Sequence, residues 1–415
     1  MTATTPAHPA RSAPPAEPDA GNGAIAAPQA PAGALTPAGP KAPAEPKTPA
    51  EPKTPAATQP GGGPVRLRRT ATPVVLATVV LLVSVVVGVA VGPAGLSPEQ
   101  VVAAVIDRLP GHPHLAVSAL NSAIVWQLRL PRVVLGLLVG SMLAGGGAAY
   151  QGIFRNPLAD PYLLGVAAGG GLGATIVVIS GGSQALLPPA AFAGAAGAVA
   201  LTYVLGTSGR GGESLGRSNT LGRNGTGSIL LAGVAIAAML TAFQTYLQQQ
   251  HTQTLSVVYS WILGGLSAAT WSQIWLVLPY IVVAAIVLLA HRRLLDVLRV
   301  GETEAASLGV DVARVRLTVV IAATLGVSAA VAVSGLIGFV GIIVPHAIRL
   351  TVGPSYRVLL PVSMIGGAAF LVLADVAART AQAPAEVPIG VITAVAGAPF
   401  FLFVLRSRRA QQDLS

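Results

Sequence analysis

The sequence contains no cysteine, and only 10% of its 415 residues are charged, whereas an average soluble domain carries roughly 25%. The absence of cysteine excludes disulfide bonds, thiolate metal sites and cysteine catalysis. In contrast, 53% of the residues are apolar and the mean hydropathy is +0.70. Apolar runs of about 20 residues, the length that a helix needs to cross a bilayer, recur along the chain. The composition therefore indicates an integral membrane protein.

The sequence also lacks the groups that would let it power transport by itself. All of its lysines, Lys41, Lys47 and Lys53, lie near the N-terminus, and it contains no G-x-x-x-x-G-K-[ST] motif for binding phosphate. Acidic residues are nearly absent from the apolar runs, with Asp375 as the exception, although proton- and sodium-driven carriers usually need buried carboxylates. These absences favour a membrane subunit that a separate ATPase drives. An ion-gradient-driven secondary carrier is the alternative from a different class.

Residues 1–65 form a proline- and alanine-rich segment that repeats AEPKTP at Ala44–Pro49 and Ala50–Pro55. Few of its residues could build a core, so we expect a disordered cytoplasmic tail, either a passive extension or a spacer. It has no apolar region of the kind that secretory signals carry. The chain then divides into this tail, a transmembrane domain at 66–408 and a short C-terminal tail at 409–415.

Ten apolar segments are each expected to form a membrane-spanning helix. They cover residues 74–92, 131–152, 162–180, 186–206, 228–248, 271–290, 317–333, 335–352, 358–377 and 388–405. Glycine and alanine crowd several of them, and small residues let helices approach closely in lipid. The predicted fold is therefore all-α, a polytopic membrane helix bundle of about ten transmembrane helices.

The distribution of arginine predicts the orientation of this bundle. Arginines within 66–69 precede the first span, and basic residues mark the cytoplasmic side of a membrane. An even number of spans then places both termini in the cytoplasm. Most other arginines fall on the same side, but four are predicted to lie outside: Arg108, Arg129, Arg132 and Arg379. These residues depart from the rule and need another explanation.

Two polar segments are predicted on the cytoplasmic side. Thr207–Gly227 is glycine-rich and is expected to be a flexible loop, in which the sequence does not identify the gate residues. Residues 291–316 are too polar to span and are expected to form two short helices separated by glycines. Their small apolar surface could hold an ATPase, and a solvated connector is the alternative.

Two proline-containing sites are expected to shape helix ends on the inner side. Asn156 and Pro157 would form the turn between the second and third spans. Pro345 and His346 would end the eighth span, either as a helix-end cap or as a contact for an ATPase.

The segment Arg129–Gly173 carries RLPR, GxxxQ and NPLAxPxxLG in that order, and it resembles the FecCD-type permeases. These permeases are the membrane subunits of ABC importers for ferric siderophores, haem and cobalamin. Further matching segments follow in order: Leu231–Val234, Trp261–Leu266, Gly301–Val310, Gly335–His346 and Glu386–Val391. The resemblance covers residues 70–408, and the long N-terminal tail and the long 207–227 loop depart from the family pattern.

The resemblance implies a type II ABC importer permease in a bacterial inner membrane. Such a subunit would form the pathway for an iron–siderophore complex that a substrate-binding protein delivers, with cobalamin or haem as alternatives. It would pair with a second permease subunit, in a homodimer or a heterodimer, and with cytoplasmic ATPase subunits. ATP and Mg²⁺ would bind to the ATPase, so this chain would not be an enzyme and would carry no cofactor or metal. No nucleic-acid partner is expected.

The resemblance also assigns roles to individual residues. The arginines that would dock the substrate-binding protein are Arg129, Arg132 and Arg379, which would explain their position on the outer side. The loop that would couple the chain to the ATPase contains Gly301, Glu302, Ala305, Leu308 and Gly309.

Overall fold

The structure of the protein is a computed structural model that describes residues 68–108, 117–208 and 224–412. The described residues fall within one compact unit, Pro64–Ser415, and contain helices and turns but no β-strand. The predicted tail at 1–65, most of the Thr207–Gly227 loop and the last residues of the C-terminal tail lie outside the described residues. The all-α prediction is confirmed for the described part of the chain.

Seven of the described helices or helical stretches have the length and the apolar composition to cross a membrane. The long helices are α1 (Arg68–Ala90), α4 (Leu130–Ile153), α6 (Leu187–Ser208), α7 (Asn224–Gln250), α9 (Trp271–Val300), α11 (Val312–Ser334) and α13 (Tyr356–Thr380). The shorter apolar helices are α5 (Val166–Ile179), α12 (Val340–Val352) and α14 (Ile389–Gln412), whose apolar part ends at Phe403. Every predicted span therefore corresponds to a helix, with ends that differ by up to ten residues, as at the end of α9.

Short helical segments connect these helices. They are α2 (Pro98–Ile106), α3 (Ala119–Ala123), the π-helical η1 (Ile124–Arg129), the 3₁₀ turns η2 (Pro161–Leu164), η3 (Gln184–Leu186) and η4 (Thr252–Thr254), α8 (Leu255–Ile262) and α10 (Glu302–Ser307). The sequence around Ser97 explains the start of α2. The Ser97 hydroxyl accepts from the backbone N–H of Gln100, and the Gln100 side chain accepts from the backbone N–H of Ser97, which is a capping box.

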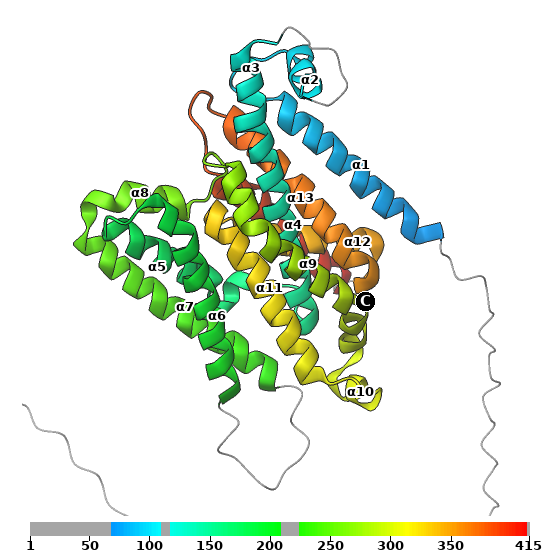
Figure 1. The fold of residues 1–415 in the computed structure, drawn as a ribbon. Helices are drawn as coiled ribbons and strands as arrows, with labels where there is room; N and C mark the ends of the chain where they lie inside the picture. Colours follow the sequence, from blue (N-terminus) through cyan, green and yellow to red (C-terminus); the bar gives the residue numbers. More distant parts are fainter. Residues whose placement is uncertain (1–67, 109–116, 209–223, 413–415) are drawn as a thin grey trace, which may run out of the picture. The chain divides into compact units, whose positions relative to one another are not determined.

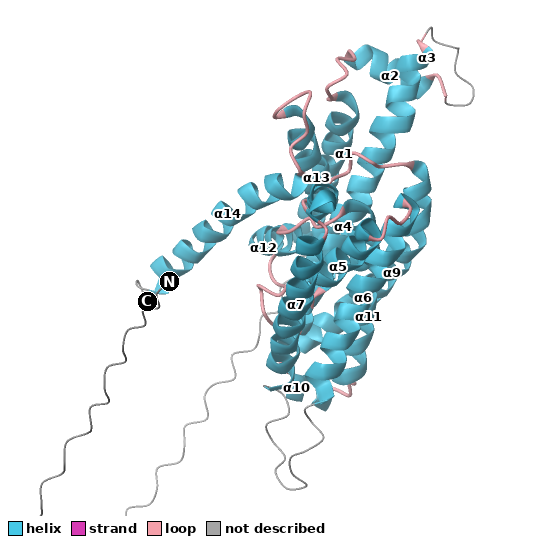
Figure 2. Ribbon diagram, turned by 90° about the vertical axis from the view of Figure 1, so that its left-hand side faces the viewer, coloured by secondary structure: helices cyan, strands magenta, loops and turns pink. Residues whose placement is uncertain are grey.

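Helix α4 lies at the centre of the bundle. It packs against α9, α11, α12 and α13, and 78% of the most apolar part of its helical stretch is buried. Helices α5, α6 and α7 pack together on one side, where α6 also contacts α11 (Figure 1). Helix α1 packs against α13, and α14 leaves the bundle at an angle (Figure 2). Helices α2 and α3 lie at one end of the bundle and α10 at the other (Figure 1).

Glycines bring α4 into backbone contact with two neighbours. A Cβ atom at Gly140 would clash with the carbonyl oxygen of Gly367 in α13. A Cβ atom at Gly147 would clash with the backbone of Gly341 in α12. At these crossings only hydrogen fits between the helices, so the prediction that small residues serve close packing is confirmed here.

One prediction for the 291–316 segment is wrong. Residues 291–300 do not form a separate short helix, because α9 runs without a break to Val300. Leu295 and Leu298 keep the helical spacing and are buried, so the amphipathic pattern continues the helix through its charged residues. Only α10 is a separate short helix, and it lies between Gly301 and Gly309.

The prediction that Pro345 and His346 end a helix is also wrong. Both residues are buried inside α12, which continues to Val352, and the His346 ring lies edge-on to Phe400 with 6.2 Å between ring centroids. A proline within a helix leaves the carbonyl four residues earlier without its usual donor. Here that carbonyl belongs to Gly341, and the Gln151 side chain donates to it at 3.0 Å. A donor from α4 therefore lets α12 continue through the proline.

Candidate functional site

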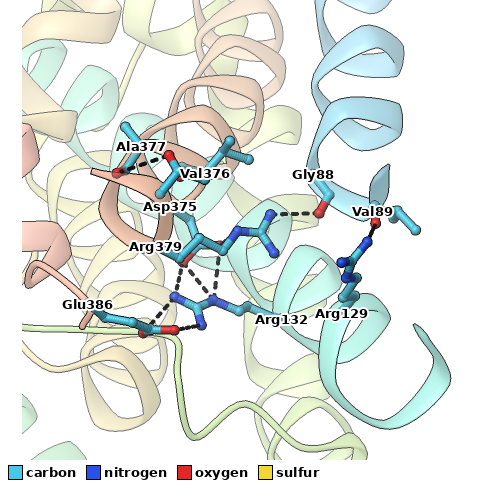
Figure 3. Close-up of polar contacts among 10 residues, drawn as sticks. Gly88, Val89, Arg129, Arg132, Asp375, Val376, Ala377, Arg379 and Glu386 are labelled. Atoms are coloured by element: carbon cyan, nitrogen blue, oxygen red, sulfur yellow. Dashed lines mark hydrogen bonds and ion pairs between the residues drawn. The ribbon is translucent and has the colours of Figure 1, made fainter. Parts of the chain in front are cut away.

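Five charged residues gather where the last turn of α1, the first turns of α4 and the end of α13 meet. This group, here called the arginine cluster, consists of Arg129, Arg132, Asp375, Arg379 and Glu386 (Figure 3). Its members come from two distant parts of the sequence. Arg129 and Arg132 flank Pro131 at the start of α4, and the other three lie in α13 or shortly after it. The three arginines that were predicted to share a site are therefore brought together.

Two carboxylates hold the guanidinium group of Arg132. Its Nε atom donates to Asp375 Oδ1 at 2.8 Å and to Oδ2 at 3.0 Å, and its Nη1 and Nη2 atoms donate to Glu386 Oε1 at 2.7 Å and Oε2 at 3.0 Å. Paired contacts of this kind are the strong form of an arginine–carboxylate interaction. The Asp375 side chain is only 2% exposed, whereas that of Glu386 is 35% exposed. Arg132 therefore has a buried partner and a solvent-accessible one.

Arg129 and Arg379 instead cap the end of α1. Arg129 Nη1 donates to the carbonyl oxygens of Val89 and Ala90 at 2.9 and 2.8 Å, and Arg379 Nη2 donates to that of Gly88 at 2.6 Å. The last carbonyls of a helix have no partner within the helix, and positive charge at this end is favourable. The two guanidinium groups supply both the donors and the charge.

The arginine cluster gives the three residues partners within the chain that the sequence analysis did not predict. Arg129 and Arg379 are buried, and the Arg132 side chain is 11% exposed. Their role in docking a binding protein stays a prediction. The spacing of Asp375 and Arg379, four residues apart on one helix, was a sequence signal for an ion pair, and their Oδ2 and Nε atoms lie 3.5 Å apart. Nothing local indicated that Glu386 would join them.

The predicted coupling loop lies at the opposite end of the bundle, around α10 (Figure 1). Glu302 forms an ion pair with Arg316 of α11, which ties α10 to the bundle. Leu308 is 71% exposed and Val300, just before Gly301, is 68% exposed. Ala305 is completely buried, so it lies on the inward-facing side of α10 and does not belong to the exposed surface. The apolar surface that could meet a partner therefore consists of Val300 and Leu308.

Asn156 shapes the turn after α4, as predicted. Its side-chain oxygen accepts from the backbone N–H of Leu158 at 2.9 Å, and Pro157 lies between them. The preceding residue, Arg155, has a positive φ of 47°, a conformation that few residues other than glycine adopt. The turn thus rests on a local hydrogen bond of the type that asparagine favours.

A contact that the sequence analysis missed joins α9 to the start of α13. Asp296 accepts from the Ser355 hydroxyl at 2.7 Å and from the backbone N–H of Tyr356 at 2.6 Å. Nearby, Arg349 Nη2 donates to the Gln151 side-chain oxygen at 2.8 Å, which links α12 to α4. The partners are separated by 59 residues or more along the chain, so no local pattern could have indicated these contacts.

Helix α7 presents an unusual face. Only 22% of its most apolar part is buried, and its exposed side mixes small and polar residues at helical spacing with large apolar ones. The small and polar residues include Ala235, Ala238, Thr241, Thr245 and Gln249, and the large apolar ones are Leu231, Val234, Met239, Phe243 and Tyr246. The opposite face packs on α5, where the buried Gln244 amide donates to Thr175 at 3.1 Å. A helix side that meets lipid normally carries large apolar residues, because polar groups are costly in hydrocarbon. The small and polar residues therefore suit a protein neighbour or a water-filled path, whereas the large apolar residues beside them suit lipid or an apolar partner.

Several known proteins are similar to this chain. A model of the FecCD transport family matches residues 80–407. The chain is 43% identical over 295 residues to the cobalamin import system permease protein BtuC of Halobacterium salinarum, which covers 69% of this chain and 74% of the relative. It is 39% identical over 299 residues to the hemin transport system permease protein HmuU of Yersinia pestis, covering 70% and 85%. A solved inward-facing metal-chelate type ABC transporter matches with a TM-score of 0.69 and 28% identity, covering 81% of this chain and 99% of that one.

Proposed function

The chain belongs to the FecCD transport family and is an ABC importer permease subunit, and we propose that it carries a metal chelate of the cobalamin, haem or siderophore class. The observation that carries this proposal is the family match, which spans nearly all of the described residues. Cobalamin is the first candidate, because the relative with 43% identity is a cobalamin permease, and haem is the second. An iron–siderophore complex, favoured from the sequence, is the third.

The end of the bundle that contains α10, here called the α10 end, is proposed to bind the ATPase (Figure 1). The sequence has no phosphate-binding loop, so energy has to come from another subunit. Val300 and Leu308 offer exposed apolar contacts beside the acidic residues Glu302 and Glu304. An ATPase bound here would put the α10 end in the cytoplasm, in line with the arginine-rich 291–316 segment and with the prediction that both termini are cytoplasmic.

The exposed face of α7 is proposed to line the pathway together with a second permease subunit. The hydroxyl and amide groups of Thr241, Thr245 and Gln249 could exchange hydrogen bonds with a polar chelate. The alanines beside them leave room for a large substrate. A second copy or a related subunit would remove this face from lipid.

The arginine cluster is proposed to lie on the outer side, near the docking site for a substrate-binding protein. It occupies the end of the bundle opposite α10 (Figure 1). Arg132 is the candidate for contact, because Glu386, one of its two carboxylate partners, is accessible. Carboxylates of a binding protein could replace that partner.

Transport in liposomes tests the proposal. The chain would be purified with its co-purifying ATPase and supplied with cyanocobalamin, haemin or a ferric hydroxamate, with and without a binding protein. We expect ATP-dependent uptake of one of the three probes. Uptake that continues without the ATPase and stops with a proton ionophore would overturn the proposal and support a secondary carrier.

A further inference from the structure

Asp296 of α9 connects the part of the chain next to α10 with the start of α13. It lies in the last part of α9, shortly before Gly301 and α10, and its side chain is 16% exposed. Both of its carboxylate oxygens contact the start of α13, through Ser355 and the backbone N–H of Tyr356. Arg357 lies nearby, with its Nε atom 3.7 Å from Asp296 Oδ2.

This contact is an unusual helix cap, because the acceptor comes from another helix. Ser355 has the backbone conformation of an N-cap residue, but its side chain makes no capping hydrogen bond within α13. Its hydroxyl donates to Asp296 instead, and the same carboxylate accepts from the first N–H of the helix. Negative charge here also favours the helix N-terminus. The cap of α13 is therefore attached to α9.

The far end of α13 reaches the arginine cluster. The helix has 25 residues, so it is roughly 37 Å long. Midway, Gly367 meets Gly140 of α4 in backbone contact. At its end, Asp375 contacts Arg132 and Arg379 contacts α1. One continuous helix thus joins the carboxylate of Asp296 to the charged groups at the opposite end of the bundle.

We propose that Asp296 is a positioning residue that passes movement of the α10 end to α13, and through α13 to the arginine cluster. The inference rests on the proposed function, in which an ATPase binds at α10. Displacement of α10 by the ATPase would move the end of α9, and the carboxylate would carry the start of α13 with it. Without the carboxylate, α9 could move while α13 stayed in place.

The test is a graded series at this position in the assembled permease–ATPase complex. Asp296→Asn keeps one acceptor oxygen and Asp296→Ala keeps none. Thr270→Ala is the matched control. Thr270 is the N-cap residue of α9 and accepts from the backbone N–H of Gln273 in the same helix, so this contact does not join two helices. We expect cyanocobalamin uptake per ATP hydrolysed to fall about fivefold or more in the alanine variant, the lower end of typical coupling effects. The asparagine variant should be intermediate, and the control should match the wild type.

A second readout separates coupling from simple loss of structure. The chain has no cysteine, so Leu120→Cys and Thr380→Cys provide the two sites on this chain for spin labels at the arginine-cluster end, and labelling precedes assembly with the ATPase. Both positions are exposed. Vanadate trapping should change the distance between the labels in the wild type and in Thr270→Ala. The change should be lost in Asp296→Ala although ATP hydrolysis continues.

The outcomes separate the two proposals. If the wild type shows no ATP-dependent uptake of any probe and no vanadate-dependent distance change, the proposed function fails. If the wild type responds and Asp296→Ala keeps both its uptake per ATP and its distance change, the role of Asp296 is refuted. Should the alanine variant not fold, Asp296→Asn takes its place, because it removes the charge and one of the two acceptor oxygens. Unchanged uptake per ATP together with an unchanged distance change in Asp296→Asn would then refute the role.

Discussion

Helices α4 and α7 are both long and apolar, yet they have opposite surroundings. The most apolar part of the stretch that contains α4 is 78% buried, whereas that of α7 is 22% buried. Glycines let α4 touch α12 and α13 directly, while the exposed side of α7 carries alanines, hydroxyl and amide groups among large apolar side chains. The difference shows that small residues have two uses in this bundle. They allow close packing in α4 and accompany the exposed polar groups of α7.

The largest expected effect comes from filling the α4 crossing. Gly140→Leu would push a side chain into the backbone of Gly367, which cannot move aside as a flexible side chain could. We expect a loss of at least about 3 kcal/mol of stability and little folded protein, at the upper end of the cost of overpacking. Size-exclusion profiles and melting curves of detergent-purified protein would measure this. Gly197→Leu on α6 is the control, because nothing lies near the Cβ position there. Equal melting temperatures for both variants would contradict the assignment.

Removing the buried carboxylate of the arginine cluster should be the next largest effect. Asp375→Asn leaves Glu386 as the remaining negatively charged partner of Arg132 in the arginine cluster and deprives Arg379 of its nearby charge. Truncating one partner of a buried ion pair typically costs about 3 kcal/mol or more. Thermal unfolding would test this, with Asp311→Asn as the control in the exposed Asp311–Arg314 pair. Exposed pairs contribute only about 0.2–1 kcal/mol, so similar losses in both variants would show that the cluster is not structural.

Changes on the open face of α7 should affect transport without affecting the fold. Thr245→Leu and Gln249→Leu replace exposed polar groups, so the melting temperature should stay close to that of the wild type. We expect uptake to fall about tenfold, which corresponds to roughly 1.4 kcal/mol in the rate-limiting barrier. The matched control is Val86→Leu on the exposed face of α1, where uptake should not change. Normal uptake in both α7 variants would remove this face from the pathway.

The smallest effect should come from Glu386→Gln. Neutralising this accessible carboxylate weakens its hold on Arg132 but leaves the buried Asp375 contact in place. If Arg132 docks the binding protein, association should tighten by about 0.2–1 kcal/mol, the usual size of an exposed ion pair, and more so at low salt. Binding measured at two salt concentrations would show this. Unchanged or weaker association would argue that Arg132 serves the fold only. Reversing the charge of Arg129 is a poorer test, because it would also remove the cap of α1.

Local patterns determined most of the architecture. Runs of apolar residues predicted the seven long and three shorter apolar helices of the described chain, and the order Ser97, Pro98 and Gln100 explains the start of α2. These features depend on hydropathy and on hydrogen bonds between neighbours in the chain, so the amino-acid sequence encodes them directly. The family resemblance likewise rests on short motifs that can be read in order.

Only the tertiary structure decided how the charged residues are used. Arg132 finds its carboxylates 243 and 254 residues away, and Asp296 finds the start of α13 59 and 60 residues away. Pro345 stays within a helix because a side chain from α4 replaces the missing donor. Each outcome depends on which helix ends meet, and that is set by the packing of the bundle. The sequence therefore specified the helices and their family, while the partners of the buried polar groups emerged only when the helices were assembled.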